Sequence, residues 1–88
     1  RQFIRAHTSG FDNLKEAVRE YTPQAAADIC GVKATDIVLA ARWFGSANAS
    51  LSLYCQGLNQ STHGTDNNAA LINLHLATGH IGRPGAGP

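Results

Sequence analysis

Apolar residues recur at helical spacing near the start of the chain and predict an amphipathic helix over residues 9–21. Ser9 is a candidate N-cap for this helix, with Asp12 three positions later where a capping box places an acidic or amide side chain. The charged side chains between the apolar ones form its solvent side. The apolar face, spaced three and four residues apart as one side of a helix requires, consists of Phe11, Leu14, Val18 and Tyr21.

Two further helices are predicted before residue 48. The Thr22-Pro23 step should begin one of them, because threonine can cap a helix and proline suits its first position, and Gly31 should end it. The other is predicted from Thr35 to Phe44, with Gly45 as its stop. The narrow apolar stripe of the first is Ala25, Ala26 and Ile29, and the aromatic residues expected to pack in the core from the second are Trp43 and Phe44.

The pattern changes at Ala49. From Ala49 to Cys55 apolar and polar residues alternate, which predicts a strand. A polar loop from Gly57 to Asp66 follows. Apolar residues then surround nearly the whole circumference of residues 67–78, which predicts a buried helix ended by Gly79. Turn chemistry is expected at residues 82–85.

This order of elements predicts an α/β fold class. Three helices followed by a strand, a loop and a helix would form a helix-rich fragment of a three-layer α/β domain rather than a complete helical bundle. The chain is predicted to be a single segment over its 88 residues, with a helical part at residues 1–48 and a strand-loop-helix part at residues 49–88. A core of this size buries only about 60% of the unfolded surface, so the segment alone should be marginally stable.

Composition and charge argue against two kinds of partner. Seven Lys+Arg against six Asp+Glu give a formal charge of +1, and the basic residues are scattered from Arg1 to Arg83, so no nucleic acid is expected as a partner. No apolar run approaches the roughly 20 residues that a membrane helix requires, so no membrane span is expected. No signal peptide is predicted from the start of the chain, and Arg1 is expected to be an internal residue of a longer chain.

The cysteines and histidines predict neither a metal site nor a catalytic nucleophile. Cys30 and Cys55 match no zinc motif or disulfide framework, and we expect reduced, buried thiols. His75 and His80 are five positions apart, which does not place them on one helical face, and no Glu or Cys completes a ligand set. His75 is predicted to be a hydrogen-bonded core residue, and His63 a polar group of the loop.

The loop after the predicted strand is the candidate binding site. A strand, a glycine-containing loop and a helix N-terminus together can bind an anion, because the first N–H groups of the helix are unpaired and its dipole is positive there. Gly57 would let the backbone turn sharply and approach a ligand. The loop matches neither G-x-G-x-x-G nor a P-loop, and a solvated connection is the alternative interpretation. Its neutral polar side chains are Asn59, Gln60, Ser61, Thr62 and Thr65.

Four runs of residues in the second half of the chain resemble a known family. They are Gly57–Ser61 (GLNQS), Gly64–Asn68 (GTDNN), Asn73–Leu76 (NLHL) and Thr78–Pro88 (TGHIGRPGAGP). Their ordered series resembles the molybdenum-bis(molybdopterin guanine dinucleotide) oxidoreductases, which include nitrate reductases, formate dehydrogenases and dimethyl sulfoxide reductase. Shorter matches upstream extend the resemblance over nearly all of the chain. Within the family, GLNQS and GRPGAGP are most similar to assimilatory and periplasmic nitrate reductases.

The resemblance implies a cofactor-binding part of an enzyme. The segment would belong to a nitrate reductase catalytic subunit and help to bind molybdenum-bis(molybdopterin guanine dinucleotide) for the reduction of nitrate to nitrite. Gln60 would contact the pterin near the metal, Gln56 would lie close to it too, and Gly57 and Asn59 would also bind the cofactor. Gln56 stands where the family commonly has methionine, which favours a more polar pocket wall. No catalytic residue and no metal ligand is expected here, because the molybdenum ligand and a 4Fe-4S cluster would lie elsewhere in the parent chain.

The same resemblance implies partners and a location. The partners would be the remainder of the parent catalytic subunit, nitrate, and an electron-donor protein or domain, and an assimilatory enzyme would be cytoplasmic. The isolated segment should neither reduce nitrate nor bind metal tightly. Two alternatives stay open: another molybdopterin oxidoreductase, such as a formate dehydrogenase-like protein, or a non-catalytic helical interaction module whose glycine-rich tail is a linker.

Overall fold

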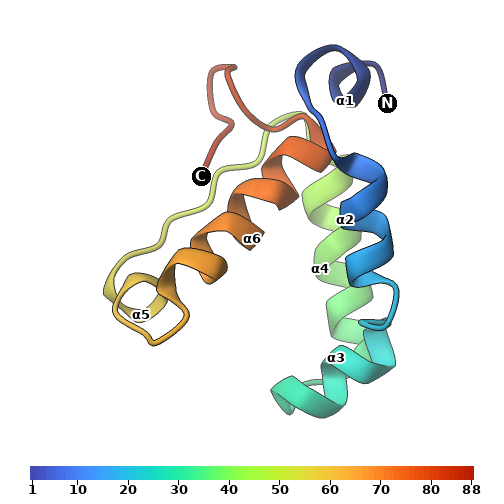
Figure 1. Cartoon of the computed structure of the whole chain (residues 1–88), viewed down its shortest axis with the longest axis vertical. Coiled ribbons are helices and arrows are strands. Elements are labelled where there is room, and N and C mark those ends of the chain that lie inside the picture. The colour runs from blue at the N-terminus through green and yellow to red at the C-terminus, as the bar shows by residue number, and fades with distance from the viewer. The chain divides into compact units, whose positions relative to one another are not determined.

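The computed structural model describes all residues from Arg1 to Pro88 and contains six helices and one extended segment (Figure 1). The chain forms two compact units. Unit 1 consists of Arg1–Ser9 and Asn48–Pro88, and unit 2 consists of Gly10–Ala47. The helices are α1 (Gln2–His7), α2 (Phe11–Val18), α3 (Pro23–Cys30), α4 (Ala34–Ser46), α5 (Gln56–Asn59) and α6 (Gly64–Thr78).

In unit 2, α3 has the ends that the sequence predicts. The Thr22 hydroxyl accepts a hydrogen bond from the backbone N–H of Ala25 at 3.2 Å, and Pro23 occupies the first turn. Gly31 ends the helix in the left-handed conformation, with φ of 73°. Because glycine adopts this conformation without a Cβ clash, the chain can leave the helix there at little cost.

The burial predicted in unit 2 is partly wrong. α3 packs against α4, but Ile29 of the predicted apolar stripe is 71% exposed, and the buried apolar residue is Ala27. Trp43, expected in the core, is 68% exposed, while its neighbour Phe44 is half-buried. Periodicity identifies a helix face, but it does not tell whether another element covers that face.

The ends of α2 and α4 also differ from the prediction. Gly10, in the left-handed conformation with φ of 76°, occupies the N-cap position of α2, and no side chain caps the helix. The predicted Ser9 cap is therefore wrong. α4 continues through Gly45 to Ser46, because a glycine inside a helix costs only about 1 kcal/mol relative to alanine and need not end it.

In unit 1, residues 49–55 form an extended segment rather than the predicted strand. One parallel bridge joins Leu51 to Gly87. It is made by hydrogen bonds from Ser52 N–H to the Gly87 carbonyl at 3.0 Å and from Gly87 N–H to the Ser50 carbonyl at 3.1 Å. Alternation favours an extended backbone, but a strand also needs a partner along its length. The helix-rich character is confirmed, and the three-layer α/β arrangement stays a prediction.

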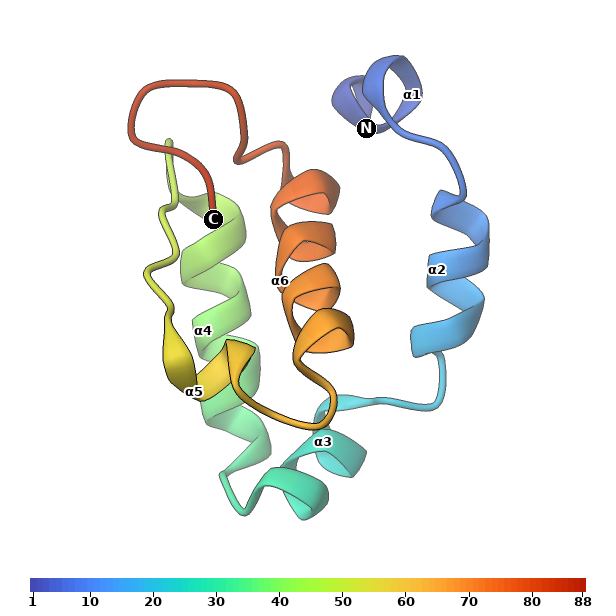
Figure 2. The same cartoon turned by 60° about the vertical axis from the view of Figure 1, so that its left-hand side comes forward.

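The last helix, α6, runs back beside the extended segment, and α5 lies at the turn between them (Figures 1 and 2). α6 begins at Gly64, earlier than predicted, and ends as predicted before Gly79, whose φ is 74°. It is not buried around its circumference, since Leu74 is 43% exposed whereas His75 is fully buried. The short helix α1, which the sequence analysis did not predict, contacts α6.

The C-terminal residues form the predicted turn. The Ala86 N–H donates to the Arg83 carbonyl at 3.1 Å, and the two residues form a bridge. Cys30 and Cys55 are free thiols, but both are exposed, so the expected burial is wrong. No helix combines the length and the apolar character that crossing a membrane demands.

Candidate functional site

The four predicted site residues lie together on one short helix and its C-cap. Gln56, Gly57 and Asn59 belong to α5, and Gln60 is its C-cap, with φ of −91° and ψ of 55°. The Gln60 N–H donates to the Gln56 carbonyl at 2.8 Å, and all four residues are exposed. The first half of the predicted loop is thus a helical turn that presents three amide side chains from adjoining positions.

Two glycines of this region have different roles. Gly57 does not adopt a positive φ, so the sharp turn predicted there is wrong, but a Cβ on it would meet nothing within 4 Å. That open space leaves room for a ligand to approach the backbone. Gly64 is buried, and a Cβ on it would overlap the Asn59 carbonyl oxygen, with the Asn59 carbonyl carbon at 3.0 Å. Gly64 therefore lets α5 lie directly against the start of α6.

Ser61 joins α5 to α6. Its carbonyl accepts a hydrogen bond from Gly64 N–H at 3.1 Å, and its hydroxyl accepts one from the Asn67 amide, also at 3.1 Å. The hydroxyl lies 3.5 Å from the Leu58 carbonyl, at the limit of a hydrogen bond. Ser61 was predicted to be one of the polar groups of the site. In the structure it is exposed, and its hydroxyl is engaged in closing the turn.

The N-terminus of α6 has no side-chain cap. His63 occupies the N-cap position without a side-chain hydrogen bond to the helix, and Asp66 lies in the first turn. The negative charge of Asp66 complements the positive end of the helix dipole. An anion at this end would also meet the Asp66 carboxylate, so a neutral polar group is the better electrostatic match.

The side chains exposed at α5 are amides, which are neutral and polar. Primary amides donate and accept hydrogen bonds at once, which suits a heterocycle that carries both kinds of group. Among the side chains described, no three His, Cys, Asp or Glu residues gather in a way that could hold a metal ion. The α5 side chains thus offer hydrogen-bond donors and acceptors, and their assignment to a cofactor stays a prediction.

The prediction that His75 is a hydrogen-bonded core residue is confirmed. Its Nε2 lies 2.7 Å from the Ser52 hydroxyl, and its Nδ1 lies 2.7 Å from the His80 carbonyl oxygen. His80 is 2% exposed, and its Nδ1 accepts a hydrogen bond from the Arg83 guanidinium at 3.0 Å. Ser52 was not among the predicted site or core residues. The alternation that places Ser52 on the opposite face from Leu51 and Leu53 is the signal that could have identified it.

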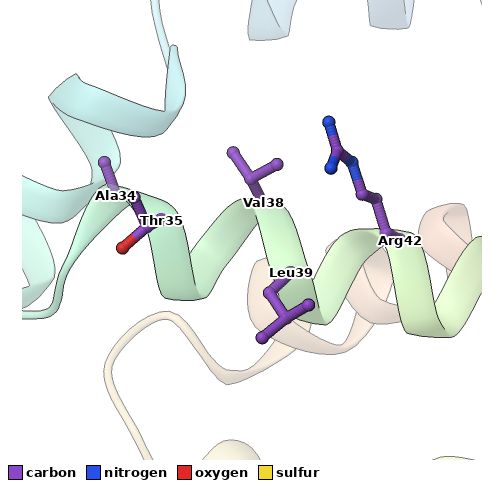
Figure 3. Close-up of a pocket in the computed structure, with 5 residues that line it drawn as sticks. All are labelled: Ala34, Thr35, Val38, Leu39 and Arg42. Atoms are coloured by element: carbon purple, nitrogen blue, oxygen red, sulfur yellow. The ribbon is translucent and has the colours of Figure 1, made fainter.

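Unit 2 carries a hollow along α4 with a volume of about 430 Å³ (Figure 3). Val38 and Arg42 extend from one side of the helix in this view, one turn apart. The hollow contains no pair of groups that could act as acid and base or hold a metal. The residues that line it are Ala34, Thr35, Val38, Leu39 and Arg42.

Known proteins that resemble the chain are much longer oxidoreductases. The chain is 44% identical over 87 residues to the alpha subunit of the F420-dependent formate dehydrogenase of Methanocaldococcus jannaschii, and 42% identical over 87 residues to the nitrate reductase of Synechocystis. It is 44% identical over 78 residues to the periplasmic nitrate reductase of Desulfovibrio desulfuricans. These matches cover 99%, 99% and 89% of the chain, but it spans only 13%, 12% and 10% of the relatives' own length. No family model matches the chain.

These relatives confirm the coarser part of the resemblance. They belong to two of the enzyme classes that it includes, so the chain is homologous to segments of nitrate reductases and formate dehydrogenases. The nearly equal identities do not separate the two classes. The assignment to an assimilatory nitrate reductase stays a prediction, and so does the cytoplasmic location, since one relative is periplasmic.

Proposed function

We propose that this chain is a segment of the catalytic subunit of a molybdopterin-dependent oxidoreductase, and that α5 contacts the molybdopterin guanine dinucleotide cofactor. The observation that carries the proposal is the identity of 42–44% to a nitrate reductase and a formate dehydrogenase over 99% of the chain. Residues 1–88 would form a single segment of the cofactor-binding domain, and the remainder of the parent subunit would supply the metal ligand and a 4Fe-4S cluster.

Three amide side chains and one glycine would hold the cofactor. Gln56, Asn59 and Gln60 are exposed on α5 and its C-cap, and the open space beside Gly57 would let the cofactor approach the backbone. When bound, the molybdenum cofactor supplies the redox chemistry. The residues of this chain would orient its pterin through hydrogen bonds in which each amide can donate and accept.

Nitrate is the proposed substrate of the parent enzyme. It would be reduced to nitrite and water with two electrons and two protons, the electrons arriving from a donor protein or domain through the iron–sulfur cluster. The runs GLNQS and GRPGAGP, which resemble those of nitrate reductases, support this choice. The cytoplasm is the proposed location, as for an assimilatory enzyme.

Formate oxidation is the second candidate function, because the chain is 44% identical to a formate dehydrogenase alpha subunit over 87 residues. The full-length enzyme, purified and assayed with nitrate plus reduced viologen and with formate plus oxidised viologen, decides between the two. Nitrite production without formate oxidation is the expected result. Formate oxidation alone would transfer the proposal to the formate dehydrogenases.

Gln60→Ala in the full-length enzyme tests the cofactor contact. Polar cofactor atoms would lose a partner in a site from which the cofactor excludes water, at a cost of about 1–3 kcal/mol. We therefore expect cofactor affinity or turnover to fall by roughly 5- to 150-fold, depending on whether the bond acts in binding or in the transition state, and a fall in affinity should lower the molybdenum content. Molybdenum per polypeptide, turnover and melting temperature are measured together.

Thr62→Ala is the matched control for Gln60→Ala. Thr62 is exposed in the same turn and makes no hydrogen bond in the structure, so its removal should change stability by less than about 0.5 kcal/mol. Ser61→Ala is a poorer control, because it removes the acceptor of the Asn67 amide. Wild-type molybdenum content and turnover in Gln60→Ala would show that Gln60 does not face the cofactor.

A further inference from the structure

Three segments of unit 1 meet at one buried imidazole. His75, on α6, is fully buried. The Nε2 of His75 is hydrogen-bonded to Ser52 of the extended segment, and its Nδ1 to the carbonyl of His80, directly after the C-cap of α6, each at 2.7 Å. The backbone adds a second link in the same place, since His80 N–H donates to the His75 carbonyl at 3.0 Å. The His75 side chain thus connects the segment before α5 to the helix after it.

The directions of these bonds follow from the chemistry of their atoms. The His80 carbonyl can only accept, so Nδ1 of His75 carries a hydrogen and donates it. In the neutral imidazole, Nε2 then has a free lone pair, and the Ser52 hydroxyl donates to it. Both ring nitrogens are satisfied, as a buried polar group requires. Without the Ser52 hydroxyl, Nε2 would lose that hydrogen-bond donor inside the unit.

The Ser52 hydrogen bond fixes the entrance of α5. Ser52 lies four residues before Gln56, and its backbone N–H is also held by the Gly87 carbonyl at 3.0 Å. On the exit side, Gly64 begins α6 directly against Asn59. Both ends of the turn that carries the amide side chains are therefore anchored to α6, one through the His75 ring and the other through the chain itself.

We propose that His75 is a positioning residue for the cofactor-contacting turn: by holding Ser52 against α6, it sets where α5 begins and thus how Gln56 and Gln60 meet the cofactor. The inference rests on the proposed function. His75 would act without touching the cofactor, because its ring is fully buried and both of its nitrogens are used within unit 1.

The test measures hydrogen exchange in the full-length enzyme, with and without bound cofactor. The reporters are the N–H groups of Leu58, Asn59 and Gln60, which donate to the carbonyls of Cys55, the N-cap of α5, and Gln56, its first residue. Ser52→Ala should speed their exchange by roughly 10-fold, because the loss of one hydrogen bond at a buried acceptor makes opening easier by about that factor. Molybdenum content should fall with it. Ser52→Thr keeps the hydroxyl and should restore both quantities.

His75→Asn distinguishes the Nδ1 hydrogen bond to the His80 carbonyl from the Nε2 hydrogen bond to Ser52. An asparagine amide nitrogen can take the place of Nδ1 and still donate to the His80 carbonyl, but it presents nothing at the position of Nε2. This variant should match Ser52→Ala in the exchange of α5, and the double variant should be no worse than either single one, since both remove the same bond.

Thr78→Val is the matched structural control. Thr78 also donates a side-chain hydrogen bond from α6, to the Leu74 carbonyl at 2.9 Å, but this bond stays within the helix. Its loss should leave the exchange of α5 at the wild-type rate. Equal acceleration by Thr78→Val, no acceleration by Ser52→Ala, or no rescue by Ser52→Thr would each overturn the positioning role.

The proposed function and the positioning role fail in different measurements. If Gln60→Ala has wild-type cofactor content and turnover, the proposed cofactor contact is wrong. If Ser52→Ala has wild-type hydrogen exchange in α5, the proposed anchoring of α5 is wrong. A Ser52→Ala enzyme with faster exchange in α5 but unchanged molybdenum content and turnover would also contradict the inference, because the anchor would then not serve the cofactor.

Discussion

Unit 1 and unit 2 are both helical, but the hydrogen bonds inside each unit are of different kinds. In unit 2, side-chain hydrogen bonds join residues three or four positions apart: Ala25 N–H to Thr22, Gln24 to Asp28, and Ser46 to the Arg42 carbonyl. In unit 1 bonds also join residues far apart in the sequence, such as Ser52 to His75. The buried polar side chains, His75 and His80, both belong to unit 1, whereas the buried apolar residue, Ala27, belongs to unit 2.

The difference shows what each kind of contact can specify. Local caps determine where a helix begins and ends, and they leave its orientation to whatever packs against it. Directional bonds between distant segments determine where a turn lies relative to a neighbouring helix. The candidate site belongs to the unit with the second kind of contact, as expected if cofactor binding requires fixed positions for the α5 amides.

Among the variants that test the difference between the two units, Gly64→Ala is expected to lower local stability the most, and to do so in unit 1. The added methyl group would overlap the Asn59 carbonyl, and since backbone cannot swing aside as a side chain can, α5 must move. Overpacking of this kind costs about 1–3 kcal/mol. Native-state hydrogen exchange of the full-length enzyme should be faster at α5 and at the start of α6, which would show the loss of local stability.

Gly57→Ala is the control for that experiment, since it adds the same methyl group one helix earlier. Its Cβ would meet nothing within 4 Å, and its φ is not positive. Alanine favours the helix by up to about 1 kcal/mol over glycine, so in the cofactor-free enzyme α5 should be unchanged or more stable. A cost similar to that of Gly64→Ala would contradict the close packing described at Gly64.

A smaller effect, confined to unit 2, is expected from Thr22→Ala. It removes the hydroxyl that accepts the Ala25 N–H, a loss of about 1 kcal/mol for a typical N-cap. Thr22→Ser should retain most of this stability. Exchange should accelerate in α3 and not in α5, as measured residue by residue. Acceleration in α5 as well would show that the two units do not respond separately.

The smallest effect is expected from Glu16→Gln on α2. The Glu16 carboxylate lies 3.0 Å from the Arg19 guanidinium, but the two side chains are 69% and 75% exposed. Water and salt screen such pairs, and a change below about 0.5 kcal/mol is expected. The difference in melting temperature between the wild type and Glu16→Gln should be small, and nearly the same at low and high salt. A strong salt dependence would show that electrostatic contacts contribute more to unit 2 than its local caps do.

The sequence predicted the elements whose signals are local. The bounds of α3 follow from a capping threonine, a proline and a left-handed glycine, all within one segment. The extended conformation of residues 49–55 also follows from alternation. Whether this segment pairs along its length as a strand cannot be predicted from alternation, because pairing depends on segments far along the chain. Cys55 and Trp43 were expected to be buried for their residue types, and both are exposed.

For the candidate site, the sequence indicated the region and the residue types but not the geometry. The resemblance pointed to Gln56, Gly57, Asn59 and Gln60, and their assignment to the cofactor stays a prediction. The helical turn that carries them was interpreted as a loop because Gly57 was taken as a turn residue. Alternation could have placed Ser52 on the face opposite Leu51 and Leu53. Its partner could not be predicted, since the hydrogen bond to His75 joins residues 23 positions apart.

The bridge between Leu51 and Gly87 has a consequence for the order in which unit 1 folds. Helices such as α6 can form within about a microsecond from contacts a few residues apart. The bridge instead encloses α5 and α6 in one long loop, and closing such a loop costs chain entropy before any contact repays it. During synthesis, the entrance of α5 can therefore reach its final position only after Gly87 has emerged from the ribosome.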